Sequence, residues 1–166
     1  MDIKVKLRKG CFYNNEVWFS PAYQRLTLGA RDLLQCLYTE IKKSKIKTKK
    51  ATKKEWVFMN NAELSFTEKE YKELTGKCSA TYLKSRNQLI EVGFIEQTHR
   101  GGTCRGDRAM YSVFFGDKTM PISKQRWRRY PQENWADEIP KAKKQLVGVN
   151  TQFKKGKSAR KLKPTL

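Results

Sequence analysis

The chain has 166 residues, with 36 Lys and Arg against 16 Asp and Glu, which gives a formal net charge of +20. The length suits one domain, and the charge favours a polyanion as the partner. The sequence contains no apolar run of about 18 residues, which excludes a membrane-spanning helix. Its four cysteines lie at least 25 residues apart and His99 is the single histidine, so no zinc site is expected.

The positive charge is concentrated in two segments. Residues 42–54 contain eight lysines and residues 141–166 contain nine basic residues, neither with an acid, and together they hold 17 of the 20 excess charges. Both segments have few apolar residues, which is typical of polyanion-binding arms. We therefore expect a lysine-rich loop over 42–55 and a basic disordered tail over 141–166.

The first 19 residues predict an N-terminal strand or hairpin extension. Apolar and basic residues alternate from Ile3 to Arg8, which is the period of a half-buried strand. Asn14 and Asn15 mark a turn, around which residues 11–13 and 17–19 are expected to pair as a small hairpin.

Two helix starts follow. Ser20 before Pro21 is a favourable N-cap, and Thr27 can cap a new start after a kink. From Ala30 to Ile41 an apolar stripe predicts the first helix of a three-helix core. After the lysine-rich loop, residues 56–59 are interpreted as a short strand.

A capping box and two glycines delimit the next two helices. Thr67 and Glu70 have capping-box spacing, and Gly76 can end that helix with positive φ. The following helix begins near Cys78 or Ser79 and ends at Gly93. Its inward positions are Tyr82, Ser85 and Leu89, together with the stem of Arg86; its outward positions are Ser79, Ala80, Leu83, Lys84 and Asn87. No acid occurs between residues 77 and 90.

A β-hairpin follows that helix. Residues 94–98 predict a strand, residues 100–108 a glycine-rich loop, and residues 109–115 a second strand. Beyond it, residues 117–140 form an extension in which Trp127, Tyr130 and Trp135 alternate with arginines. Two alternatives stay open for these aromatic rings: packing over the core, which we prefer, or stacking on a single-stranded nucleic acid.

The order of these elements predicts an α+β fold, a winged helix-turn-helix over residues 20–116 with a β-hairpin wing. The run Thr81-Tyr82 and residues 89–95 resemble the recognition-helix ending of winged-helix DNA-binding proteins. Residues 20–34 resemble the opening of winged-helix proteins encoded by phages and plasmids. The resemblance implies a role in transcription regulation or replication control. Arg86 departs from it, because such families usually have an apolar residue there.

These observations predict a non-enzymatic, sequence-specific protein that binds double-stranded DNA, without metal or cofactor, in the cytoplasm and associated with the nucleoid. Two alternatives remain: a protein that binds RNA or the ribosome, and a protein-interaction module of a larger assembly. Contact with single-stranded nucleic acid and a homodimer stay open, and no membrane partner is expected. The predicted DNA-binding residues, from the third helix and the wing, are Lys77, Ser79, Thr81, Lys84, Arg86, Asn87, Arg100, Arg105 and Arg108.

Overall fold

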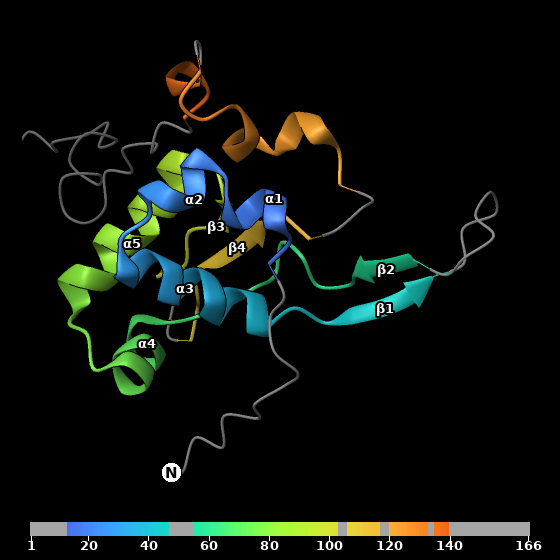
Figure 1. Cartoon of the computed structure of the whole chain (residues 1–166). Helices are drawn as coiled ribbons and strands as arrows, with labels where there is room; N and C mark the ends of the chain where they lie inside the picture. The colour runs from blue at the N-terminus through green and yellow to red at the C-terminus, as the bar shows by residue number, and fades with distance from the viewer. Residues whose placement is uncertain (1–12, 47–54, 103–105, 117–119, 133–134, 140–166) are drawn as a thin grey trace, which may run out of the picture.

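The protein is mixed α+β. A computed structural model describes residues 13–46, 55–102, 106–116, 120–132 and 135–139 (Figure 1). Within these ranges the chain forms five α-helices and two separate two-stranded antiparallel sheets, followed by three 3-10 turns. No helix in the described ranges is long and apolar enough to cross a membrane.

The N-terminal segment is helical where a strand was expected. Helix α1 spans Asn15–Trp18, so the prediction of a strand over residues 17–19 is wrong. The helical turn places Val17 in the core with 3% of its surface exposed, and the Ser20 hydroxyl donates a hydrogen bond of 2.7 Å to the Val17 carbonyl. Of the partner strand expected at residues 11–13, only Tyr13 lies within the described residues. The strand expected at residues 3–8 lies outside them.

Helices α2 (Pro21–Arg25) and α3 (Leu28–Thr39) begin at the predicted caps. The Ser20 hydroxyl accepts from the Tyr23 N–H at 3.1 Å, and the Thr27 hydroxyl accepts from the Ala30 N–H at 3.3 Å. Helix α3 buries the predicted apolar stripe in the centre of the molecule. The two cap predictions are confirmed because each depends on contacts local in sequence.

The ends of the expected lysine-rich loop are strands. Strand β1 (Lys43–Ile46) pairs antiparallel with β2 (Glu55–Phe58), with Lys43 opposite Phe58. The prediction of a loop over residues 42–55 is therefore wrong at both ends, and residues 47–54 lie outside the described part. The strand expected at residues 56–59 exists as β2, and its partner is β1.

Helices α4 (Glu68–Thr75) and α5 (Ser79–Val92) have the predicted boundaries. The Thr67 N–H donates to Glu70 Oε2 at 2.7 Å while the Glu70 N–H donates to the Thr67 hydroxyl at 3.3 Å, so the capping box is present. Gly76 and Gly93 have φ of 70° and 89°, the left-handed conformation that ends each helix.

Strands β3 (Ile95–His99) and β4 (Met110–Val113) form the second hairpin, behind α3 in Figure 1. An isolated bridge joins Leu64, just before α4, to Tyr111 of β4. Leu64, Phe94, Tyr111 and Val113 are each no more than 1% exposed and complete the core beneath α3 and α5.

The extension after β4 packs on the core through its 3-10 turns η1 (Ile122–Lys124) and η2 (Arg126–Arg129); η3 (Ala136–Glu138) follows. Trp127 is 2% exposed, stacks on Phe94 with ring centroids 5.4 Å apart, and donates from Nε1 to the Phe114 carbonyl at 2.7 Å. For Trp127 the packing alternative is confirmed. Tyr130 is partly buried against the core and lies edge-on to Trp135 at 4.7 Å.

Candidate nucleic-acid interface

Helix α5 presents one exposed face and one buried face. The side chains of Tyr82, Ser85 and Leu89 are buried at 6%, 2% and 0% exposure. The five predicted outward positions are all exposed: Ser79, Ala80, Leu83, Lys84 and Asn87. The helical phase predicted from the sequence is therefore confirmed, and the exposed face has no carboxylate before Glu91 near its C-terminal end.

The orientation of α5 is set by contacts on its buried side. The Tyr82 hydroxyl donates to the Phe66 carbonyl at 2.8 Å, which ties α5 to the segment before α4. On α3, Gly29 allows close helix packing, because a Cβ built there would lie 2.8 Å from the Ser85 hydroxyl oxygen. Gln88 accepts from the Thr27 hydroxyl at 2.9 Å and donates to the Arg25 carbonyl at 3.2 Å. These contacts hold the exposed face in one position relative to the core.

Lys77 lies just before α5 and is paired with an acid of the core. Its ammonium group contacts the Asp32 carboxylate of α3 through a hydrogen-bonded ion pair. That hydrogen bond raises the pKa of Lys77 above its ordinary value. Sequence reasoning missed Asp32 because the two residues are 45 positions apart.

Arg86 and Asn87 act as a pair on α5. Arg86 is half-buried, and its guanidinium donates to Asn87 Oδ1 from Nε at 3.3 Å and from a terminal nitrogen at 3.1 Å. The stem of Arg86 thus lies partly against the protein while its charge reaches outward. This geometry explains how an arginine is accommodated where an apolar residue was expected.

Thr81 and Cys78 contact each other at the start of α5. Their Sγ and Oγ1 atoms are 3.3 Å apart, and Thr81 is half-buried while Cys78 is exposed. Hydrogen bonds from Thr81 lower the pKa of the Cys78 thiol. Burial, by contrast, raises the pKa of Cys36 to about 12, so that thiol stays protonated.

Cationic residues flank the loop between β3 and β4. Arg100 is exposed, whereas Arg105 lies outside the described residues. Arg108 donates to Glu70 Oε1 of the α4 capping box at 3.2 Å. His99 Nε2 and Asp107 Oδ1 are 2.6 Å apart and join the two sides of the loop. The Arg108 contact places the start of β4 beside the start of α4.

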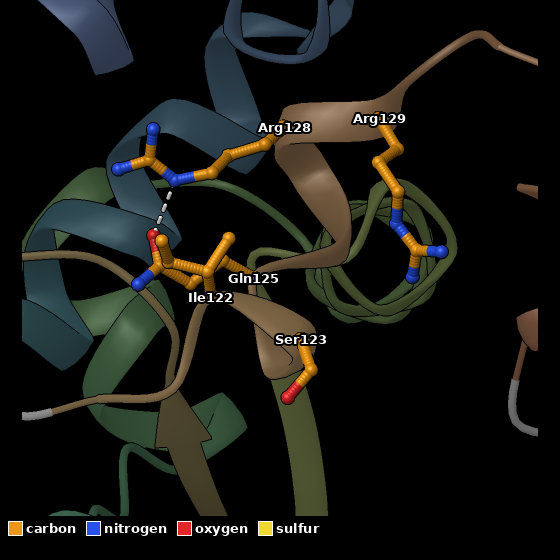
Figure 2. A pocket seen from close by; sticks show the side chains of 5 residues that line it. All are labelled: Ile122, Ser123, Gln125, Arg128 and Arg129. Atoms are coloured by element: carbon orange, nitrogen blue, oxygen red, sulfur yellow. Dashed lines mark hydrogen bonds between the residues drawn. The ribbon is translucent and has the colours of Figure 1, made fainter.

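An open hollow in the extension was not predicted. It has a volume of about 510 Å³ and is lined by Ile122, Ser123, Gln125, Arg128 and Arg129. Figure 2 shows Arg128 directed to Gln125, with its Nε 2.5 Å from Gln125 Oε1, while Arg129 extends along the other side. Arg128 also pairs with Glu16 of α1. Arg128, which lines the hollow, therefore also joins the extension to helix α1.

The structure places the predicted residues in two groups. Lys77, Ser79, Thr81, Lys84, Arg86 and Asn87 lie on or beside the exposed side of α5, and Arg100 and Arg108 flank the loop between β3 and β4. In the described ranges no three His, Cys, Asp or Glu side chains form a group that could hold a metal ion. Comparisons of the chain with protein-family models, curated proteins and solved structures found no match.

Proposed function

We propose that the protein binds double-stranded DNA sequence-specifically through a winged-helix arrangement and acts in transcription regulation or replication control of a mobile element. In this proposal, helices α3, α4 and α5 form the three-helix core of the winged-helix arrangement, and the β3–β4 hairpin is its wing. The bridge from Leu64 to Tyr111 adds a minimal third strand to the wing sheet. The order of these helices and strands, together with this strand pairing, supports the proposal.

The observation that carries the proposal is the exposed face of α5. It projects polar and cationic groups from a helix whose other side is fixed in the core, and its first twelve residues lack acids. A helix of this kind fits the major groove, where a lysine ammonium pairs with guanine acceptors and an asparagine amide pairs with adenine. We assign base contact to Lys84 and Asn87.

Other residues are assigned to the DNA backbone. Ser79 and Thr81 lie in the first turn of α5, where hydroxyls and free N–H groups favour phosphate. Arg100, Arg105 and Arg108 of the wing follow the backbone or enter the minor groove. Lys77 already pairs with Asp32, and Arg108 already pairs with Glu70. Each of these two cations is therefore held in place by its acid and would contact a phosphate in addition to that acid.

The test begins with selection of bound sequences from a random duplex pool. We expect Lys84→Ala and Asn87→Ala each to weaken binding to the selected site by about 1 to 3 kcal/mol and to relax the choice of one base. Binding to random duplex should change far less. Lys69→Ala on the exposed side of α4 is the matched control and should retain the preference.

Equal loss on selected and random duplexes would contradict base reading by α5. If structured RNA outcompetes duplex DNA at the same salt concentration, the RNA-binding alternative replaces the proposal.

A second candidate function has one observation in its favour. Leu83 lies on the exposed face of α5 at 43% exposure, and Leu74 of α4 is 51% exposed. Exposed leucines suit a protein-interaction module, although an apolar side chain in the groove can also contact a thymine methyl group. Leu83→Ser distinguishes the two functions. If α5 binds DNA, the variant should keep most of its affinity for random duplex. If α5 binds a protein, the variant should no longer capture that partner.

A further inference from the structure

The β1–β2 hairpin is anchored firmly at its base. The Asn60 amide accepts from the Lys42 N–H at 2.7 Å and donates to the Glu40 carbonyl at 3.0 Å, and the Met59 N–H donates to the Lys42 carbonyl at 2.9 Å. The Lys43 ammonium donates to the Tyr38 hydroxyl at 2.8 Å and lies 4.3 Å from the centre of that ring. The hairpin therefore leaves the C-terminal end of α3 in a defined direction.

The described part of this hairpin is cationic. Lys42, Lys43 and Lys45 are all exposed. Lys43 and Lys45 are two residues apart on one strand and so lie on the same face of the hairpin. Exposed ammonium groups complement the phosphates of a nucleic-acid backbone, which they bind as point charges without reading sequence.

The hairpin and α5 lie on different sides of the molecule. Figure 1 shows β1 and β2 extending away from the core on the side opposite α5, with α3 and the β3–β4 hairpin between them. The exposed face of α5 points away from this core, because its buried side packs against α3. The lysines of β1 and the exposed face of α5 are therefore separate surfaces with the core between them.

We propose that the β1–β2 hairpin binds the backbone of a second duplex DNA segment, so that one molecule bridges two segments. The inference rests on the proposed function of α5, because the hairpin binds a second duplex only if α5 has bound the first. The hairpin supplies attraction without sequence preference, and α5 supplies the choice of site. Bridging of this kind brings a distant segment to the selected site.

The experiment uses the full chain and two duplexes of about 16 base pairs, roughly one and a half helical turns. One duplex carries the selected site and a donor dye, and the other has random sequence and an acceptor dye. We expect energy transfer on adding protein, and sedimentation should show one protein with two duplexes. Lys42→Glu with Lys45→Glu should weaken capture of the second duplex about ten-fold and leave the first bound, because each reversal replaces a positive charge of the hairpin with a negative one that repels phosphates.

The matched control is Lys69→Glu with Lys72→Glu on α4, which changes the net charge by the same amount at exposed positions. It should retain energy transfer. If both double variants lose energy transfer equally, the loss is due to the change in net charge alone, and the inference is overturned. A one-to-one complex at every duplex ratio, or a complex with two proteins, also overturns it while the proposed function stands. Failure to bind even the selected duplex overturns both.

Discussion

At the residue scale, neighbouring positions of α5 have opposite roles. Tyr82 is 6% exposed and contacts the ring of Tyr71 at 5.6 Å between centroids, whereas the next residue, Leu83, is 43% exposed. Burial also raises the pKa of Tyr82, so its hydroxyl remains a hydrogen-bond donor to Phe66. One step along the helix thus separates a residue of the core from a residue of the candidate interface.

We expect Tyr82→Ala to lower the free energy of unfolding by about 3 kcal/mol or more, because it removes a buried ring. Tyr82→Phe removes only the hydroxyl bond and should cost about 1 kcal/mol. Leu83→Ala is the exposed control, with an expected change within about 0.5 kcal/mol. Urea unfolding measures all three. Similar values for Tyr82→Ala and Leu83→Ala would contradict the packing of α5.

Glu70 predicts a pH dependence of stability. Burial alone raises its pKa, but hydrogen bonds from the Thr67 N–H and hydroxyl and the positive charge of Arg108 together lower it below its ordinary value of 4.5. The folded protein therefore binds this proton less readily than the unfolded chain does. The carboxylate stabilises the fold above pH 4.5, and that stabilisation is lost as the pH falls through the lowered pKa.

Glu70→Gln should accordingly destabilise the protein near pH 7, and the difference from the parent should shrink as the pH falls below 4.5. Urea unfolding at several pH values measures this difference. Glu73→Gln, at an exposed position of the same helix, is the control for the loss of one negative charge. A difference for Glu70→Gln that does not vary with pH would show that its carboxylate has no special stabilising role.

At the scale of elements, the end of α5 depends on the extension. Arg126 is 7% exposed, and its guanidinium donates to the carbonyls of Ile90 and Glu91, the latter at 3.0 Å. Gly93 leaves room for this contact, since a Cβ there would lie 2.8 Å from Arg126 Cβ. A cation at the C-terminus of a helix also interacts favourably with the helix dipole.

We expect Arg126→Met to lower the free energy of unfolding by about 2 kcal/mol, because the last carbonyls of α5 lose a charged donor. Amide hydrogen exchange should accelerate most over residues 89–93. Lys124→Met, at an exposed position of the same extension, is the control and should change neither quantity much. Unchanged exchange in Arg126→Met would mean that the extension does not stabilise α5.

The elements predicted from the sequence were those with local signals. Thr27, the Thr67–Glu70 box and the terminal glycines mark the ends of α3, α4 and α5 within a few residues, because caps act over one turn. The β1–β2 pairing was missed since lysines obscure the alternation typical of a strand. The ion pairs of Lys77 and Arg108 were missed for a different reason: their partners are 45 and 38 residues away, and only the tertiary fold joins them.

At the scale of the whole molecule, positive charge is unevenly distributed along the chain. Outside residues 42–54 and 141–166 there are 19 basic and 16 acidic residues, so the remainder is close to neutral. Several of its cations are paired with acids of the same domain, as Lys77 is with Asp32 and Arg128 with Glu16. Under the proposed function, we therefore expect sequence-specific contacts and general attraction to a polyanion to come from different parts of the sequence.

Removing residues 141–166 tests this division. The segment carries nine basic residues and no acid, and each neutralised phosphate contributes about 0.9 to the salt dependence of the binding constant. We expect the truncated protein to show a flatter plot of log binding constant against log salt, with weaker binding to every duplex. Its ratio of affinities for selected and random duplexes should stay unchanged, because Lys84 and Asn87 remain on α5. The measurement is a salt titration of both duplexes with parent and truncated chains. An unchanged slope would show that this segment does not touch DNA, whereas a loss of the affinity ratio would assign it part of the sequence choice.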